Sequence, residues 1–88
     1  MAELRDTGAR YEMDEQGMTS HADYQVRDGR MYLLYVESPP ALRGSGAAGR
    51  LMSALAADAR AKGLQITPIC GYAAAWLKRS HQFRDLLD

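Results

Sequence analysis

The stretch Pro39-Pro40-Ala41-Leu42-Arg43-Gly44-Ser45-Gly46-Ala47-Ala48 joins an apolar, strand-like run to a run with helical spacing. The strand must stop at the two prolines, which cannot donate to a β-ladder. The residues from about Gly46 to Lys62 then read as an amphipathic helix. A helix N-terminus has backbone N–H groups without a partner inside the helix and carries partial positive charge. Because Gly44 and Gly46 lack a Cβ, a phosphate can approach closely, and the loop is predicted to bind a diphosphate-bearing cofactor.

Length and composition indicate a small globular protein without a strong charge. Its 88 residues suffice for one domain, and we expect a single domain over residues 1–88 whose residues 1–8 form a disordered tail. The formal net charge of zero argues against salt-driven binding of nucleic acid. No apolar stretch reaches the roughly 20 residues of a membrane span, and the polar residues 1–10 are unlike a secretory signal. We therefore expect a cytoplasmic protein, a monomer or weak dimer, with no nucleic-acid or membrane partner.

Cysteine and histidine are too sparse to indicate a metal site. Cys70 is the one cysteine, which excludes an internal disulfide framework and a multi-cysteine metal site. His21 and His81 are far apart in sequence, with no carboxylate or cysteine at ligand spacing. We therefore expect no metal.

Before the prolines, alternating apolar and polar residues predict an antiparallel meander of three strands. These strands are expected over residues 10–14, 18–27 and 30–36. Glu15-Gln16-Gly17 is the turn before the second strand, and Asp28-Gly29, which favours a type I′ turn, precedes the third. The third strand is more continuously apolar, so we expect it to be the central strand, covered on both faces.

After the glycine loop, the pattern predicts a crossover helix followed by a fourth strand. Apolar residues at helical spacing and the ending Lys62-Gly63 support a helix up to about Lys62. A strand over residues 64–69 follows and is expected to lie parallel to the third strand, because strand–helix–strand crossovers are right-handed. A short helix over residues 73–79 and a helical turn within residues 82–87 complete an α+β (α/β) fold.

Residues 37–52 resemble the acetyl-CoA-binding segment of the GNAT N-acetyltransferase superfamily. Its signature is Arg or Gln, two residues, Gly, one residue, and Gly or Ala, which Arg43, Gly46 and Ala48 satisfy. From about residue 10 to its end, the chain is similar to the small, single-domain branch of that superfamily. The branch has a Pro-x-Cys segment and a basic, aromatic C-terminal pattern, here Pro68-Ile69-Cys70, Tyr72, Trp76, Lys78-Arg79, His81 and Phe83.

The resemblance implies a compact GNAT-like fold and transfer of an acetyl group from acetyl-CoA to a primary amine, on a small molecule or a protein lysine. It implies these cofactor-binding residues: Arg43, Gly44, Ser45, Gly46, Ala47, Ala48, Arg50, Tyr72, Lys78 and His81. Backbone N–H groups of the loop are expected to bind the diphosphate, and Arg43 to pair with phosphate. The alternatives are a glycine loop that only begins a helix, a surface role for Arg43, and a core position for Tyr72.

Three residues are candidates for the chemistry: Tyr35, Glu37 and Cys70. Tyr35 and Glu37 are expected on one face of the third strand, with Glu37 accepting a proton from the incoming ammonium through water and Tyr35 donating to the leaving thiolate. The alternative is that Tyr35 belongs to the core and Glu37 to a solvated strand end. The Cys70 thiolate either accepts the acetyl group, or the thiol lines the channel, or it is a buried small apolar side chain.

The chain departs from the resemblance at Tyr35, where many members of the small branch have a histidine. Two other readings therefore stay open beside the enzyme. One is a CoA-binding module without turnover, and the other is a protein-interaction domain that kept the fold and lost the cofactor.

Overall fold

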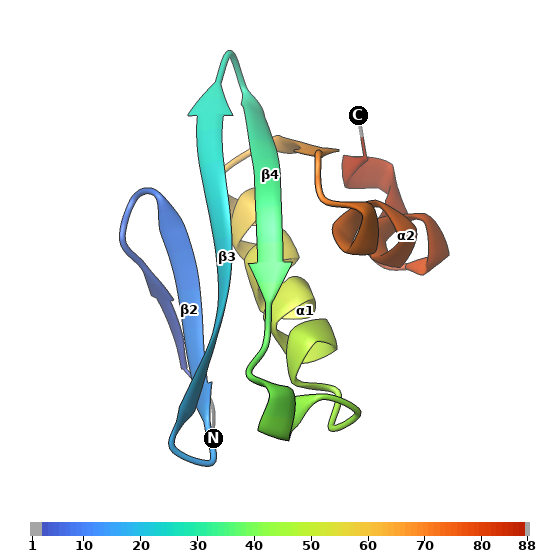
Figure 1. Ribbon diagram of the computed structural model, residues 1–88. Coiled ribbons are helices and arrows are strands. Elements are labelled where there is room, and N and C mark those ends of the chain that lie inside the picture. The colour runs from blue at the N-terminus through green and yellow to red at the C-terminus, as the bar shows by residue number, and fades with distance from the viewer. Residues whose placement is uncertain (1–2, 88) are drawn as a thin grey trace.

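A computed structural model describes residues 3–87 as a five-stranded sheet with two α-helices (Figure 1). In chain order the elements are β1 (Leu4–Asp6), β2 (Arg10–Glu15), β3 (Met18–Arg27), β4 (Arg30–Glu37), the 3₁₀ helix η1 (Pro40–Leu42), α1 (Ala47–Ala61), β5 (Gln65–Pro68), α2 (Gly71–Arg79) and the 3₁₀ helix η2 (Arg84–Leu86). The strands lie in the order β1-β2-β3-β4-β5. Neighbours from β1 to β4 pair antiparallel, and β5 pairs parallel to β4, as the crossover predicted.

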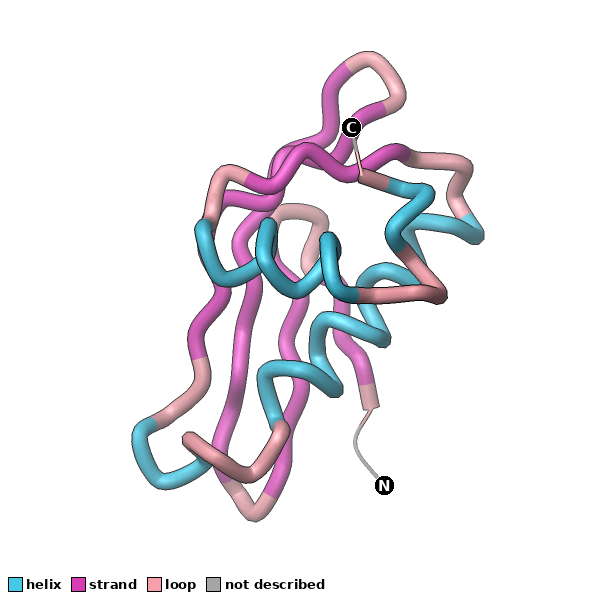
Figure 2. The backbone as a smooth tube through the Cα atoms, turned by 90° about the vertical axis from the view of Figure 1, so that its right-hand side faces the viewer, coloured by secondary structure: helices cyan, strands magenta, loops and turns pink. Residues whose placement is uncertain are grey.

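The two α-helices bury side chains in one core, α1 across one face of the sheet and α2 beside β4 and β5, so the protein has two layers (Figure 2). Between the layers lies one core, to which β2 contributes Tyr11 and Met13 while α1 contributes Leu51 and Leu55. Strand residues with the opposite orientation, such as Glu12, face away from the helices. Within residues 3–87, no helix is both long and apolar enough to cross a membrane.

The β3–β4 hairpin contains an irregularity that decides which side chains of β4 face outward. Asp28 and Gly29 have φ of 51° and 78°, as a type I′ turn requires, and Arg27 pairs with Arg30 beside them. The register then shifts by one residue: Tyr24 pairs with Leu33, but the preceding Asp23 pairs with Tyr35. Leu34 is the extra residue of this β-bulge.

The bulge turns Tyr35 and Glu37 toward the face of the sheet that carries no helix. Their register partners are Asp23 and His21, whereas Val36 pairs with the buried Ala22. Without the extra residue, the hairpin register would place Tyr35 opposite Ala22 in the core.

Two expectations about the sheet were wrong. The tail expected over residues 1–8 is in part the strand β1, which pairs with β2, while residues 1 and 2 lie outside the described part. The third predicted strand, β4, is not covered on both faces: Met31 and Leu33 are buried, but Leu34 and Tyr35 are exposed. The reason is that both helices pack against the same face.

Candidate active site and cofactor pocket

The loop between β4 and α1 leaves a set of backbone donors at the start of the helix. Ser45 Oγ donates to Leu42 O at 2.5 Å and accepts from Ala47 N at 3.3 Å, which holds the loop in a tight turn. In this loop and the first turn of α1, four N–H groups find no acceptor among the described residues, those of Gly44, Gly46, Ala48 and Gly49. The helix N-terminus therefore presents unpaired donors together with its partial positive charge.

Two glycines make this conformation possible. Gly44 has φ of +82° and Gly46, the N-cap of α1, has φ of +88°. Side-chain-bearing residues rarely adopt this left-handed region. A Cβ on Gly44 would meet nothing within 4 Å, so its glycine is needed for backbone conformation rather than for packing within the protein.

A pocket of about 520 Å³ opens between the end of β4, this loop and the start of α2. The residues that line it are Tyr35, Val36, Glu37, Ser38, Leu42, Arg43, Gly44, Gly46, Ala47, Ala48, Gly49 and Tyr72. The pocket thus brings the predicted phosphate loop together with two of the predicted catalytic residues and with Tyr72. Of the predicted set, Ser45 shapes the loop without lining the pocket.

The pocket exists because β4 and β5 diverge. Their pairing ends at Leu33 and Pro68, and the next two N–H groups, of Ile69 and Cys70, both donate to Leu33 O, at 2.9 and 3.2 Å. No described strand pairs with β4 beyond that point on this side. The backbone around Val36 therefore borders the pocket as an open strand edge.

Two of the three predicted catalytic residues, Tyr35 and Glu37, line the pocket. Tyr35 is 50% exposed, and the negative charge of the neighbouring Glu37 raises the pKa of its phenol. Cys70 and Arg43 are close enough to act electrostatically on the same phenol. Cys70 itself is partly buried, precedes the first residue of α2 and is not among the lining residues.

Other predicted cofactor ligands lie elsewhere. Arg50 donates from Nε and Nη2 to both carboxylate oxygens of Glu15, at 2.8 and 2.6 Å, so its guanidinium is already paired. Lys78 and His81 are exposed and line neither this pocket nor the groove described next. Tyr72 does line the pocket, and burial raises its pKa.

A second groove of about 620 Å³ continues from the loop along α1 toward the C-terminal segment. It shares Gly46 and Gly49 with the first pocket. Its far wall contains Trp76, which stacks on Phe83 with ring centroids 6.2 Å apart. The helix N-terminus therefore lies between two connected hollows.

Sequence reasoning missed His21 as a neighbour of Tyr35 and Glu37. Its ring centroid lies 6.2 Å from that of Tyr35, and its register partner on β4 is Glu37. Counting outward from the Asp28-Gly29 turn would have placed His21 opposite Val36, because the sequence contains no signal for the bulge. Across residues 3–87, no three side chains of His, Cys, Asp or Glu are grouped closely enough to hold a metal ion.

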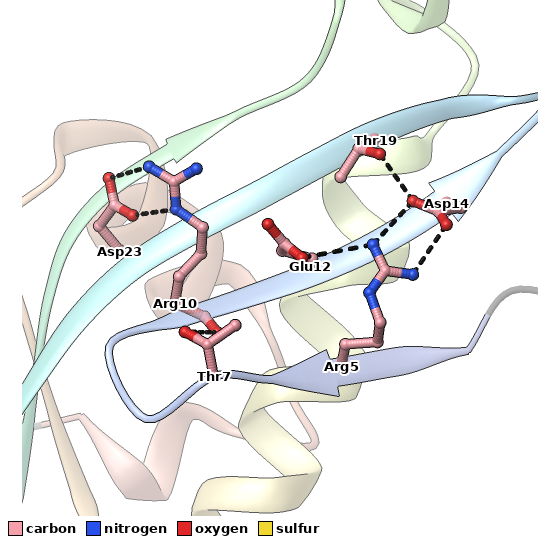
Figure 3. A network of polar contacts seen from close by, with 7 residues as sticks. All are labelled: Arg5, Thr7, Arg10, Glu12, Asp14, Thr19 and Asp23. Atoms are coloured by element: carbon pink, nitrogen blue, oxygen red, sulfur yellow. Dashed lines mark hydrogen bonds and ion pairs between the residues drawn. The ribbon is translucent and has the colours of Figure 1, made fainter.

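The helix-free face beside the site carries a network of ion pairs (Figure 3). Arg10 binds Asp23 through Nε and Nη2, at 2.6 and 3.4 Å. Arg5 bridges Glu12 and Asp14, and its hydrogen bonds hold the pKa of Asp14 at about 2. These arginines balance most of the carboxylates on the strands next to the site.

Comparison with known proteins agrees with this architecture. The GCN5-related N-acetyltransferase family matches residues 10–86 of this chain. The solution structure of a GCN5-like candidate N-acetyltransferase from Staphylococcus aureus is similar with a TM-score of 0.77 and 19% identity, over 98% of this chain and 87% of that one. At this identity the likeness supports the fold, and no curated protein matches in sequence. Since the family match spans most of its length, the chain belongs to the GCN5-related N-acetyltransferase family.

Proposed function

We propose that the chain binds acetyl-CoA at the start of α1 and transfers the acetyl group to a primary amine. One observation carries the proposal. The unpaired N–H groups of Gly44, Gly46, Ala48 and Gly49 open into a pocket that extends to Tyr35 and Glu37. An anion site and a pair of proton-transfer groups thus share one cavity.

The residues present fit the cofactor. A diphosphate is stabilised by several N–H donors and by the helix dipole, and Arg43 at the rim adds a guanidinium. The pocket volume is in the range that holds a small ligand or part of a larger one. The connected groove beside Trp76 offers room for the nucleotide half.

The bound cofactor supplies an acetyl thioester, an activated acyl group. The chain's own residues orient the reactants and move protons. A backbone N–H at the open edge of β4, near Val36, would donate to the thioester carbonyl of the bound cofactor. Holding both reactants together would supply much of the rate. The acceptor ammonium gives one proton to Glu37, and the amine nitrogen forms the new C–N bond as the C–S bond breaks. The second nitrogen proton passes through Tyr35 to the leaving thiolate, so the products are the amide, the free thiol and one released proton. Cys70, outside the pocket lining, takes no part in this scheme.

A pair of glycine variants tests the cofactor site. Gly46 and Gly63 both have positive φ, of 88° and 71°, so a side chain costs about 1–3 kcal/mol of backbone strain at each. We expect Gly46→Glu to weaken acetyl-CoA binding at least tenfold in calorimetry, because the new carboxylate stands where phosphate would bind. Gly63→Glu, at the other end of α1, introduces a similar backbone strain and should retain affinity.

The result that contradicts the site is equal affinity for acetyl-CoA in both variants. Turnover is measured separately, by release of free thiol with a panel of amines and lysine peptides. Binding without release from any acceptor would favour a CoA-binding module over an enzyme. No binding at millimolar acetyl-CoA would exclude both and leave the protein-interaction reading.

A further inference from the structure

We propose that His21 is a proton-relay residue, which takes the acceptor's proton from Glu37 and passes it to solvent. The inference rests on the proposed function and adds a residue of β3 to a site otherwise built from β4, the loop and α2. It places His21 as a residue that acts through Glu37 rather than on the reacting atoms.

The geometry of the two strands brings the groups together. His21 and Glu37 are register partners across β3 and β4 and point to the same helix-free face. Directly opposite residues of an antiparallel pair have Cβ atoms about 4.5–5.5 Å apart, so one water can bridge the two side chains. The imidazole ring also lies 6.2 Å from the Tyr35 ring, tilted by 51°.

The position of His21 suits a relay because it bridges the pocket and bulk water. Glu37 and Tyr35 line the pocket, whereas His21 does not. The side chain of His21 is 21% exposed, so its ring is in contact with both the site and solvent. A proton that reaches the imidazole can leave without crossing the cofactor.

The charges that face His21 leave Glu37 as its available proton donor. On β2, the register partner of His21 is Glu12. On β3 itself, Asp23 Oδ2 lies 4.0 Å from His21 Nε2. Arg5 and Arg10 bind these two carboxylates (Figure 3). Among residues 3–87, Glu37 forms no ion pair with an arginine or lysine.

The relay conserves protons at each step. Glu37 in its carboxylate form accepts a proton from the acceptor ammonium and becomes the acid. Neutral His21 takes that proton as imidazolium, which restores the carboxylate, and then releases it to water. An imidazole can both accept and release a proton, which a relay residue requires.

The first test needs no turnover. Ring resonances of both histidines are followed by NMR between pH 4 and 9 in the wild-type chain and in Glu37→Gln. Removing a negative charge disfavours imidazolium, so the titration midpoint of His21 should move to lower pH by about half a unit. His81, exposed and outside the pocket, is the internal control and should not move. An unchanged His21 midpoint would overturn the coupling on which the relay depends.

The second test measures turnover of His21→Gln as a function of pH. We expect kcat at pH 7 to fall about tenfold, with an unchanged KM for acetyl-CoA, loss of the wild-type acidic limb and partial rescue by added imidazole. The control is Gln25→Ala, an exposed position on the same face of β3. If the wild type acetylates an acceptor and both variants have the same kcat, the relay is wrong and the proposed function still stands. If the wild type binds no acetyl-CoA or turns over no acceptor, the proposed function fails and the relay with it.

Discussion

At the residue scale, the two arginines that flank the glycine loop have different surroundings. Arg43 is exposed at the rim of the pocket, and within the described residues it forms no ion pair. Arg50 is held by both oxygens of Glu15. A guanidinium that is already bound in this bidentate way must give up that interaction before it contacts a phosphate. Sequence spacing alone made both arginines candidates for phosphate contact.

We therefore expect Arg43→Gln to weaken acetyl-CoA binding more than Arg50→Gln. Loss of one charge-assisted contact at an exposed rim should cost about 1.4 kcal/mol, or tenfold in Kd. Arg50→Gln should change Kd less than threefold and lower the thermal midpoint slightly, because it breaks the pair with Glu15. Calorimetry on both variants measures the difference. A larger loss for Arg50→Gln would mean that the cofactor displaces Glu15.

At the element scale, local sequence predicted the hairpins and the crossover but not the bulge. Asp28-Gly29 specifies a two-residue turn, and the residues beside it pair as that turn requires. The extra residue Leu34 has no local signal, and it lies directly after the point where the pairing of β4 with β5 ends. Tyr35 and Glu37 could therefore be selected from the sequence. That His21 lies beside them depends on the register of β3 against β4, which the sequence alone does not give.

The strand β1 was missed for a related reason. The three residues of β1, Leu4–Asp6, are too few to show an alternation of apolar and polar side chains. The strand is stabilised by partners that are distant in sequence. Asp6 accepts hydrogen bonds from the phenol of the buried Tyr24 and from Lys62 at the end of α1, at 2.5 and 2.8 Å. Leu4 also packs against the core.

Removal of residues 1–7 should accordingly destabilise the protein, which a frayed tail would not do. The phenol of Tyr24 loses its acceptor, at a cost of about 1–3 kcal/mol. For a domain of this size, each 1 kcal/mol lowers the thermal midpoint by about 4–8 °C. Thermal unfolding followed by circular dichroism measures the change. Removal of residues 1–3, which leaves β1 intact, is the control, and equal midpoints for the two truncations would show that β1 contributes nothing.

The contact between α1 and β2 should make stability depend on pH. Hydrogen bonds from Lys62 and Tyr11 to Asp58, at 2.7 and 2.6 Å, lower the pKa of this carboxyl below its unfolded value. A carboxyl whose pKa is lower in the folded than in the unfolded protein stabilises the fold at pH values above its unfolded pKa. This stabilisation is lost as the pH falls through the folded pKa. Asp58→Asn should therefore cost about 1 kcal/mol at pH 7 and less than half of that at pH 2. Thermal midpoints of both proteins from pH 7 to 2 test this, and a constant difference would assign the loss to packing instead.

At the scale of the whole molecule, the placement of both helices on one face leaves the pocket mouth uncovered. Tyr35 and Leu34 are exposed beside it, and Ile69, which follows the end of β5, is 60% exposed. Under the proposed function, a small amine that enters here would make few contacts, whereas a larger acceptor could lie across the exposed apolar side chains.

Under the proposed function, a lysine peptide with apolar neighbours should therefore be a better acceptor than a small alkylamine. Burial of about 60 Å² of apolar surface contributes about 1.4 kcal/mol, which corresponds to a tenfold higher kcat/KM. Free-thiol release measures both acceptors under the same conditions. Ile69→Ser should lower kcat/KM for the peptide and leave the alkylamine unchanged, since the small acceptor does not extend to that side chain. Equal values for the two acceptors in the wild type would instead mean that the pocket alone, without the surface around it, selects the amine.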